Sequence, residues 1–418
     1  MKADLAIIGG GPAGYTAALA AAKAGPRVIL FEKHKLGGTC LNYGCIPTKT
    51  ILESTNLFSK LKKANYFGVS VDKPSIDLPR IIQRKNIVVS KLVKSLEQEM
   101  AEGKIEVVNQ EITLTEALAQ ANKVLICTGT SPKVLPGTIS TDEALALTEV
   151  PAQLQIVGAG AVGLEMATIF NQLGAKVTIC EAATQILPNA ASPQITKKIQ
   201  AVLEKHGLKI NLNTPYSPVI ASESEAISSK ERAPLPLVLS CLGRIMNNQG
   251  LADAGIALGS RGEVIVNQYL QTNLPNVYAA GDITGKLQLA HVAYMQGAIA
   301  AANLLGGKKT MDYSAVPFCV FIDPVFASVG EITGPKLREV PFSALGTSQA
   351  KGNTEGFLNL VLDEQELQIL GIQIFGSAAA ELISTATLLI KERTNVARIR
   401  ETIWAHPTLS EIFNVAFE

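Results

Sequence analysis

Apolar and polar positions alternate in a recurring order over the first part of the chain. An apolar, β-rich run covers residues 3–9, an alanine-rich stretch covers residues 15–24, and a second apolar run covers residues 27–31. Short continuous apolar runs are typical of strands buried on both faces, and the alanine-rich stretch has the composition of a helix. The order therefore predicts a strand, a helix and a second, parallel strand.

The same order returns in the middle of the chain. Residues 154–157 form an apolar run, a helical pattern extends to Leu173, and residues 176–179 form the next apolar run. Two such units indicate two doubly wound α/β folds in one chain. Further strands are predicted near the junctions of these folds, at residues 124–126, 237–242 and 276–280.

The pattern changes from Met311 onward. Residues 357–362 and 367–375 are predicted strands on either side of a polar turn. Helical spacing follows over residues 378–393, and a shorter helix is predicted to end near Ile403. Strands followed by helices are typical of a separate α+β domain.

Composition narrows the class of protein. The chain has 418 residues, of which 47% are hydrophobic, and its formal charge is only +1. Such a balance gives no reason to expect nucleic acid or an anionic membrane as a partner. The apolar runs are too short for a transmembrane helix, and the first residues lack the pattern of a leader peptide. Six cysteines in a chain of this length do not form a secreted disulfide scaffold, so we expect a cytoplasmic or organelle-matrix protein.

The first strand runs into a glycine motif. Gly9 is expected to make the tight turn, Gly11 to let a pyrophosphate approach the backbone, and Gly14 to let helix and strand pack closely. Glu32 follows the second strand, where a carboxylate binds ribose hydroxyls. Strand, glycine motif, helix, strand and acid together predict a dinucleotide site.

A second glycine motif opens the second fold, with Gly158, Gly160, Gly163 and the acid Glu181. Glu32 follows Gly9 by 23 residues, and Glu181 follows Gly158 by 23 residues. Equal spacing indicates two nucleotide-binding folds of similar design. A carboxylate at position 181 favours NAD over NADP, because it repels a 2′-phosphate. The alternative is that one fold binds nothing and serves only packing.

Two cysteines stand in the segment GGTCLNYGCIPTK. Residues five apart on an ideal helix lie about 8–9 Å from each other, whereas a disulfide needs Cα atoms within about 7 Å. Either Cys40 and Cys45 never pair, or the helix between them is distorted, which Gly44 would permit. A reducible pair near a helix N-terminus is suited to redox chemistry, and two buried core cysteines are the alternative. The remaining cysteines are expected to be inert core thiols: Cys127, Cys180, Cys241 and Cys319.

Six segments, spread along the whole chain, carry a resemblance to a known family: IIGGGPAGYTAA, GGTCLNYGCIPTK, IVGAGAVGLE, NVYAAGDITG, LAHVAYMQG and AHPTLSE. The chain resembles the class I pyridine nucleotide–disulfide oxidoreductases, and among them the members that oxidise dihydrolipoamide. The resemblance implies an enzyme with FAD in the first fold, NAD in the second and a redox-active pair Cys40–Cys45. It also implies a homodimer that oxidises a lipoyl-bearing protein of a 2-oxoacid dehydrogenase or glycine cleavage system.

With this resemblance the expected fold class is α/β, with two Rossmann-like dinucleotide-binding domains and a C-terminal α+β dimerisation domain. The expected segments are an FAD domain at 1–148 and 246–311, an NAD domain at 149–245 and an interface domain at 312–418. The predicted FAD-binding residues are Gly9, Gly11, Gly14, Glu32, Lys49, Thr128, Gly129, Asp282 and Ala290. The predicted NAD-binding residues are Gly158, Gly160, Gly163, Glu165, Glu181 and Gly243.

Three of these residues have specific alternatives or partners. By the resemblance, Lys49 and Glu165 meet near the reactive nitrogen of the flavin, and a plain surface ion pair is the alternative. Asp282 contacts the ribityl chain by the resemblance, whereas its position after a strand would also suit the N-cap of a helix at 292–305.

His406 is the expected acid–base residue, because an imidazole with an unperturbed pKa near 6.5 exchanges protons with thiols near neutral pH. Glu411 would orient the ring, although Thr408 and Glu411 also have the spacing of a capping box. The resemblance places this histidine in the active site of the partner subunit. His34, His206 and His291 stand in no comparable context, and no spacing suggests a metal site.

The chain departs from the family pattern in places. Residues 104–123 leave little room for the family's β-meander, and residues 216–236 form a compact polar stretch. Tyr294, Met295 and Gln296 stand where acidic residues are common. Two rival functions stay open: a reductase for another disulfide, such as glutathione, and a flavin- or NAD-binding protein without disulfide exchange.

Overall fold

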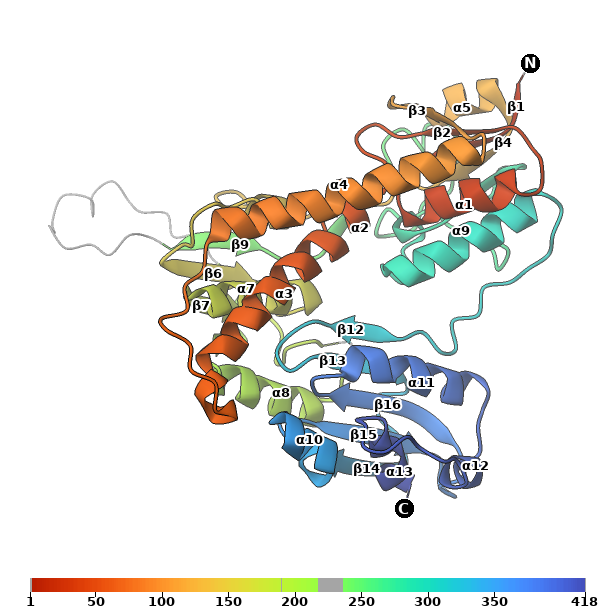
Figure 1. Cartoon of the computed structure of the whole chain (residues 1–418). Coiled ribbons are helices and arrows are strands. Elements are labelled where there is room, and N and C mark those ends of the chain that lie inside the picture. Colours follow the sequence, from red (N-terminus) through yellow and green to blue (C-terminus); the bar gives the residue numbers. More distant parts are fainter. Residues whose placement is uncertain (1, 189, 217–235, 418) are drawn as a thin grey trace, which may run out of the picture. The chain divides into compact units, whose positions relative to one another are not determined.

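A computed structural model describes residues 2–188, 190–216 and 236–417. The chain divides into two compact units that are described separately here. Unit 1 comprises residues 1–133, 140–149 and 243–312, and unit 2 comprises residues 134–139, 150–242 and 313–418. Each unit is therefore built from separate stretches of the chain (Figure 1).

Unit 1 is built on a parallel five-stranded sheet in the order β11-β4-β1-β2-β3. Its strands are β1 (Ala3–Ile8), β2 (Val28–Phe31), β3 (Glu106–Val108), β4 (Ala121–Ile126) and β11 (Val277–Ala279). All four residues of β2 and five of the six in β1 are buried, as expected for strands covered on both faces. The first two strands lie close to the ranges that the apolar pattern predicts.

Helices α1 (Pro12–Ala22) and α9 (Ala290–Leu304) pack side by side in unit 1 (Figure 1). Their close approach depends on small residues. A Cβ at Gly297 of α9 would lie 2.2 Å from the carbonyl oxygen of Ala13 in α1. The alanine-rich composition of α1 therefore reflects helix packing as well as helix propensity.

The segment between β2 and β3 carries three helices. The helices are α2 (Gly38–Asn42), α3 (Cys45–Lys62) and α4 (Leu78–Glu102), with a short 3-10 turn, η1 (Ala64–Phe67), between the last two. After β3, the compact stretch 104–123 contains helix α5 (Leu114–Gln120). Thr113 and Glu116 begin that helix with a full capping box, a local signal that the sequence analysis did not use.

The N-cap alternative for Asp282 is wrong. Helix α9 begins at Ala290 with Leu289 as its N-cap, and Asp282 lies in a separate 3-10 turn, η3 (Asp282–Thr284). Two small elements complete the described part of unit 1: an antiparallel pair, β5 (Thr130–Pro132) and β10 (Arg244–Met246), and helix α6 (Thr141–Ala144).

Unit 2 repeats the parallel design in a four-stranded sheet with the order β8-β7-β6-β9. The strands are β6 (Gln153–Val157), β7 (Lys176–Cys180), β8 (Lys209–Asn211) and β9 (Leu237–Ser240). Helix α7 (Ala161–Leu173) follows the second glycine motif, and α8 (Pro193–Lys205) follows β7. Most of the compact stretch 216–236 lies outside the described residues.

The C-terminal part of unit 2 is an antiparallel sheet in the order β12-β13-β16-β15-β14. Its strands are β12 (Phe318–Val320), β13 (Phe326–Gly330), β14 (Lys336–Pro341), β15 (Phe357–Leu362) and β16 (Ile369–Phe375). The predicted hairpin is the pair β15–β16. Helix α11 (Ala379–Lys391) packs on β13 and β16, as the predicted α+β order requires.

Two short helices end the chain. Helix α12 (Val396–Arg400) has Asn395 as its N-cap, and α13 (Glu411–Phe417) packs on β14 and β15. Two further elements, η4 (Phe342–Ala344) and α10 (Gly346–Lys351), connect β14 to β15.

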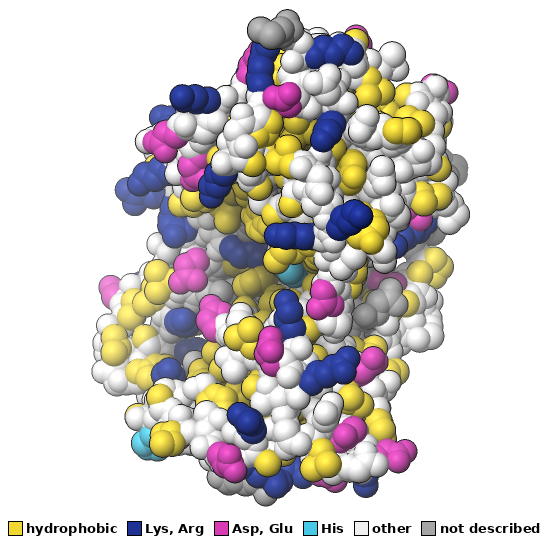
Figure 2. Space-filling model, turned by 90° about the vertical axis from the view of Figure 1, so that its right-hand side faces the viewer, with side chains coloured by type: hydrophobic (Ala, Val, Ile, Leu, Met, Phe, Trp, Pro, Cys, Tyr) yellow, Lys and Arg dark blue, Asp and Glu magenta, His cyan; other side chains and the backbone are white. Residues whose placement is uncertain are grey.

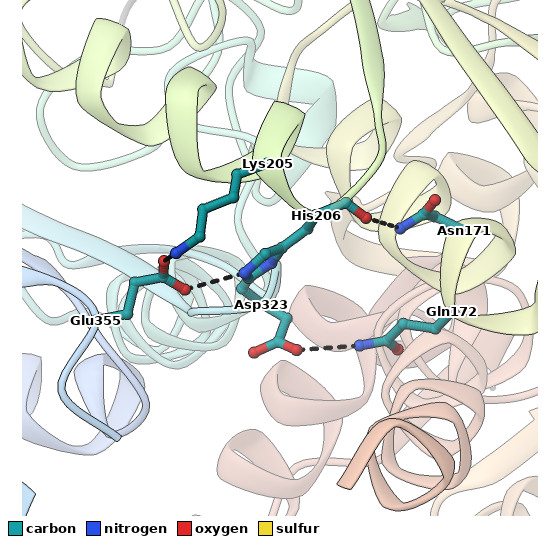
Figure 3. A network of polar contacts seen from close by, with 6 residues as sticks. All are labelled: Asn171, Gln172, Lys205, His206, Asp323 and Glu355. Carbon is teal, nitrogen blue, oxygen red and sulfur yellow. Dashed lines mark hydrogen bonds and ion pairs between the residues drawn. The ribbon is translucent and has the colours of Figure 1, made fainter. Parts of the chain in front are cut away.

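A polar network around His206 joins the parallel and antiparallel sheets of unit 2 (Figure 3). The Nδ1 atom of His206 lies 3.1 Å from the carbonyl oxygen of Asp323, and its Nε2 atom lies 3.0 Å from Glu355. Lys205 pairs with the other oxygen of Glu355 at 2.9 Å. Gln172 of α7 donates to the carboxylate of Asp323 at 3.3 Å. Nothing in the sequence pointed to this network, because the partners of His206 lie far along the chain.

Basic and acidic side chains are interspersed on the face drawn in Figure 2, in keeping with a formal charge of +1. Across the described ranges, no helix combines the length and apolar character that a bilayer crossing requires. The longest, α4, carries charged residues along its length.

Candidate active site

The two glycine loops have nearly identical backbones. Gly9 and Gly158 both have φ of +104°, a conformation that L side chains rarely adopt. A Cβ at Gly9 would lie 2.3 Å from the carbonyl oxygen of Cys127, and one at Gly158 would lie 2.7 Å from that of Cys241. Each turn therefore requires glycine for its dihedral angle and for its contact with the neighbouring strand end.

The third glycine of each motif supports the helix contact. A Cβ at Gly14 would lie 1.8 Å from the carbonyl oxygen of Gly9, and one at Gly163 would lie 1.9 Å from that of Gly158. Both positions are buried. Any side chain here would push the helix away from its own loop.

The middle glycines face open space instead. Gly11 and Gly160 are the N-caps of α1 and α7, and both have φ of −75°. A Cβ at Gly160 would meet nothing within 4 Å, and one at Gly11 would meet only the Cα of Gly38, at 3.9 Å. The unpaired N–H groups of a helix start face this space, so both loops form a cradle that suits a pyrophosphate.

Glu32 and Glu181 brace these loops. Glu32 accepts hydrogen bonds from the backbone N–H groups of Gly10 and His34, both at 2.8 Å. Glu181 accepts from Ala159 at 2.7 Å and from Ala183 at 2.8 Å. This structural role was not anticipated. It is compatible with ribose binding, because each carboxylate oxygen has a second lone pair.

A cavity of about 690 Å³ adjoins Glu32 in unit 1. Part of its lining follows β2, including His34, Lys35 and Leu36, and the side of α4 contributes the stretch from Val89 to Ala101. The sequence analysis assigned no role to α4. Its position beside Glu32 makes this cavity a fitting place for the adenosine half of a dinucleotide.

The strand ends of unit 1 contribute Thr128, Gly129 and Asp282. The hydroxyl oxygen of Thr128 is buried and has no hydrogen-bond partner among the described residues, so it can serve a ligand. The hydroxyl of Thr130 donates to Asp282 at 3.2 Å. Burial raises the pKa of Asp282, and Arg244 opposes this shift. Together with the cradle and the cavity, these groups fit FAD.

Arg244 links these strand ends to residues 37–49, which hold Cys40 and Cys45 and are called the redox segment below. The sequence did not point to this role. Its Nε atom donates to the hydroxyl of Thr130 at 2.6 Å, and its Nη2 atom donates to the carbonyl oxygen of Thr130 at 2.7 Å. The same Nη2 atom lies 3.3 Å from the hydroxyl of Thr39.

The redox segment is a broken helix, as the cysteine spacing predicts for a pair in contact. Helix α2 contains Cys40, α3 starts at Cys45, and Gly44 between them has φ −127° and ψ −105°. A hydrogen bond from the Cys40 thiol to Cys45 raises the pKa of Cys40 far above its usual range, and burial raises it further.

The remaining predicted residues lie in both units. Lys49 is a half-buried residue near the start of α3, and Ala290 is the first residue of α9. Gly243 lies just before β10 with φ of +90°. Glu165 of α7 is only 7% exposed and accepts a hydrogen bond from the backbone of Phe321 at 3.0 Å. Lys49 belongs to unit 1 and Glu165 to unit 2, and their pairing stays a prediction.

His406 and Glu411 are in contact near the C-terminus. The Nδ1 atom of His406 lies 2.8 Å from one oxygen of Glu411, and the backbone N–H of Thr408 donates to the other at 2.8 Å. These two bonds hold the pKa of Glu411 below its usual value. Glu411 is the first residue of α13, and the hydroxyl of Thr408 bonds to Ala405 and Ser410, so the contact resembles only half of a capping box.

Of the other four cysteines, Cys127 and Cys180 are buried, whereas Cys241 and Cys319 are partly exposed. Burial raises the pKa of Cys241 to about 12. At neutral pH such a thiol stays protonated and reacts slowly.

Comparison with known proteins extends over the whole chain. Residues 3–297 match the family described as pyridine nucleotide-disulphide oxidoreductase, and residues 316–417 match its dimerisation domain. The dihydrolipoyl dehydrogenase of Chlamydia muridarum is 36% identical, over 98% of this chain and 95% of that protein. One from Bacillus subtilis is also 36% identical, over 99% and 97%. The mitochondrial enzyme of Mesocricetus auratus is 31% identical, over 99% and 95%.

Solved structures show the same fold. LpdA from Mycobacterium tuberculosis matches with a TM-score of 0.88 and 25% identity, over 99% of both chains. The Cu(II) complex of the HOCl-induced flavoprotein disulfide reductase RclA from Escherichia coli matches with a TM-score of 0.86 and 29% identity, over 100% of this chain and 99% of that one.

Proposed function

This chain belongs to the pyridine nucleotide-disulphide oxidoreductase family, and we propose that it is a dihydrolipoyl dehydrogenase. The resemblance and the fold class expected from the sequence motifs are confirmed by the family match. The reaction would oxidise dihydrolipoamide on a lipoyl-bearing protein to lipoamide. The curated relatives from bacteria and mammals that carry this name support the proposal.

The family uses FAD and NAD, and the residues of this chain fit both. FAD would be held in unit 1 by the first glycine loop, Glu32, Thr128, Gly129, Asp282 and Ala290, with Lys49 nearby. NAD would be held in unit 2 by the second glycine loop, Glu165 and Glu181. Gly243, which follows β9, belongs to unit 1, and its contact with NAD stays a prediction. When bound, the flavin accepts an electron pair from a dithiol and passes it to NAD⁺ as a hydride.

The contact between the Cys40 and Cys45 thiols across the break at Gly44 carries this proposal. In the oxidised enzyme a substrate thiolate attacks the sulfur of Cys40, the bond between the two cysteines breaks, and Cys45 leaves as a thiolate. The second substrate sulfur then displaces Cys40 and closes the ring of lipoamide. Cys45 has the anionic role in this scheme because the attack falls on Cys40, and the hydrogen bond with Cys45 raises the pKa of Cys40.

His406 of the partner subunit would take the proton from each attacking substrate thiol, and it would release the first proton to solvent before it accepts the second. A base with a pKa near neutrality suits this transfer. Glu411 accepts the hydrogen bond from Nδ1, which fixes the ring and stabilises its protonated form. The match to a dimerisation domain supports a homodimer, and the sharing of one site between two subunits is part of the proposal.

We infer further that the substrate is carried by a 2-oxoacid dehydrogenase or a glycine cleavage system. We also infer a reducing compartment, the cytoplasm or an organelle matrix, because a cysteine pair that turns over must be able to return to the dithiol state.

The direct test is the substitution Cys45→Ser. We expect loss of lipoamide reduction by NADH, because no second sulfur remains to complete the exchange. FAD content should be unchanged, because the glycine loop and the cavity beside Glu32 are intact. Cys241→Ser is the matched control, since that thiol lies outside the proposed chemistry. Lipoamide turnover in Cys45→Ser at the wild-type rate would refute the proposal.

A disulfide reductase for another substrate is the second candidate, and the likeness to RclA favours it over a non-catalytic binding protein. Such enzymes commonly use NADPH, which Glu181 disfavours. Turnover with NADH and NADPH, measured with lipoamide and with glutathione disulfide, separates the two. We expect activity with NADH and lipoamide only.

A further inference from the structure

Two tyrosines approach the sulfur of Cys40 from helices that are distant in sequence. The hydroxyl of Tyr294, on α9, lies 3.9 Å from the Sγ atom of Cys40. The ring of Tyr15, on α1, lies 5.8 Å from the ring of Tyr294, and the two hydroxyl groups are hydrogen-bonded. The three residues all belong to unit 1 and form a line from the interior of the unit to the redox segment.

The packing of α1 against α9 positions Tyr15 and Tyr294 next to each other. Gly297 of α9 lies directly against Ala13 of α1, where any Cβ would meet backbone at 2.2 Å. This close approach brings Tyr294 and Tyr15 together, each near the contact point on its own helix. Both side chains are half-buried, and Tyr15 packs against the main apolar core of unit 1.

The number of protons in this line depends on the state of Cys40. Each tyrosine hydroxyl has one proton to donate and can also accept. When Cys40 is a thiol, it donates to Cys45, and Tyr294 donates to Tyr15. When Cys40 is a thiolate, Tyr294 donates to the sulfur, and Tyr15 donates to Tyr294. The two states differ in the group to which Tyr294 donates.

We propose that Tyr294, supported by Tyr15, is a positioning residue that stabilises the thiolate of Cys40. The inference rests on the proposed function for its place in the reaction. As the second substrate sulfur closes the lipoamide ring, the bond between the first substrate sulfur and Cys40 breaks. The electron pair stays on Cys40, and the proton of the second substrate thiol goes to His406 of the partner subunit.

The hydrogen bond from Tyr294 to Cys40 stabilises most strongly as the lipoamide ring closes. Cys45 is already an anion from the first step, so a second negative charge develops beside it on Cys40. A donor aimed at the place where charge develops lowers the barrier more than one aimed at the ground state. Phenylalanine at position 294 would fill the same space without the donor.

Several neighbouring groups shift the pKa values of Cys40, Tyr294 and Tyr15. Cys45 and burial raise the pKa of Cys40, whereas Tyr294 and Lys49 lower it. Burial raises the pKa of Tyr294, and so do Tyr15 and Cys40. Burial also raises the pKa of Tyr15, and Glu99 of α4 adds to that. Both tyrosines therefore stay protonated at neutral pH and keep their donors.

The experiment measures the thiolate fraction of Cys40 directly. In FAD-loaded protein with Cys45→Ser, alkylation of the Cys40 peptide by iodoacetamide is followed by mass spectrometry as a function of pH. The added change Tyr294→Phe is expected to raise the pKa of Cys40 by about one unit, which is about tenfold slower alkylation near neutral pH. Tyr15→Phe should shift it in the same direction by a smaller amount, because Tyr294 still reaches the sulfur.

Tyr278→Phe is the matched control, since Tyr278 is partly buried on β11 and packs against the same apolar core as Tyr15. Its alkylation profile should equal that of the parent. If Tyr294→Phe gives the profile of Tyr278→Phe, the proposal is overturned. Should Tyr294→Phe fail to fold, Tyr15→Phe decides alone: a raised pKa supports the proposal and an unchanged one refutes it.

This measurement uses no lipoamide, so it is independent of the proposed function. If Tyr294→Phe raises the pKa of Cys40 but the protein has no lipoamide activity, the role of the tyrosines is supported and only the proposed substrate is refuted. An unchanged pKa in an active dihydrolipoyl dehydrogenase would refute only the tyrosine pair.

Discussion

At the residue scale, the glycines of the nucleotide loops have two different roles. Some are required by helix packing, and others leave space for a ligand. Gly14 and Gly163 are required by helix packing, whereas Gly11 and Gly160 face open space. The usual glycine fingerprint does not reveal this division, because all of its glycines look alike in the sequence.

Two substitutions in the second loop should separate these roles. Gly163→Ala places a Cβ 1.9 Å from the carbonyl oxygen of Gly158, so we expect a loss of about 2 kcal/mol or more in stability. Gly160→Ala meets no atom within 4 Å and has an ordinary φ, so the unfolding temperature should hardly change. Its Cβ should instead obstruct the pyrophosphate and weaken NAD binding.

Thermal unfolding and NAD titration of both variants check this prediction. The equivalent pair in the first loop, Gly14→Ala and Gly11→Ala, provides a comparison in which FAD content replaces NAD affinity. Equal unfolding temperatures for Gly163→Ala and Gly160→Ala would contradict the packing argument.

Sequence reasoning predicted those residues whose signal is local. The glycines, Cys40, Cys45 and the contact of His406 with Glu411 each depend on neighbours a few positions away. Tyr294 was seen only as a departure from the family, and His206 was given no role. Their partners, Cys40 and Glu355, lie far along the chain, and only the folded structure brings them together.

At the scale of helices and strands, the most informative feature is the break between α2 and α3. The spacing of the cysteines requires a departure from a regular helix if they are to meet, and Gly44 marks its place. Helix α5 was not expected, although Thr113 and Glu116 supply a complete capping box. The family pattern had directed attention to a β-meander that this chain lacks room for.

Glu355, in the loop before β15, pairs with Lys205 and His206 at the end of α8. The contribution of this pairing to stability should depend on pH. Burial alone would raise the pKa of Glu355, but Lys205 and His206 outweigh it and hold the pKa below 4.5. A lowered pKa in the folded state stabilises the protein above about pH 4.5, and this contribution disappears as the pH falls through the lowered value. We therefore expect wild type to lose more stability below pH 4.5 than the Glu355→Gln variant does.

The measurement is the unfolding temperature of both proteins from neutral pH to about pH 3. The difference between them should be largest near neutral pH and should shrink in acid. Glu364→Gln, at an exposed position of the β15–β16 turn, is the control and should follow wild type. A difference that grows in acid would have the wrong sign and would contradict the argument.

At the scale of the whole molecule, the chain supplies the parts of the proposed active site from both units. Cys40, Cys45 and the first nucleotide loop belong to unit 1. The second loop and His406 belong to unit 2. His406 is exposed in the single chain, with 78% of its side-chain surface accessible. An exposed residue with a fixed orientation is what a site shared between two subunits requires.

Mixing two inactive variants tests this sharing. Cys45→Ser and His406→Gln should each be inactive as pure dimers. After dissociation and random reassociation in equal amounts, half of the dimers are mixed, and one of the two sites in each mixed dimer has both residues. We therefore expect about a quarter of wild-type activity.

Mixing Cys45→Ser with Cys40→Ser is the control, because no arrangement of those subunits gives a complete site. Capture of one variant through an affinity tag carried only by the other should confirm that mixed dimers form. If they form and the first mixture stays inactive, His406 acts within its own chain and the shared site is wrong.

The two nucleotide loops are so alike that they could not by themselves give two bound nucleotides different residence times. That difference in residence time has to arise beyond the loop. In unit 1 the 25-residue helix α4 lines the cavity beside Glu32, so a nucleotide in this cavity would lie against a long helix. In unit 2 the chain passes from β7 to the 13-residue α8. We therefore expect a nucleotide in unit 1 to be released more slowly than one in unit 2.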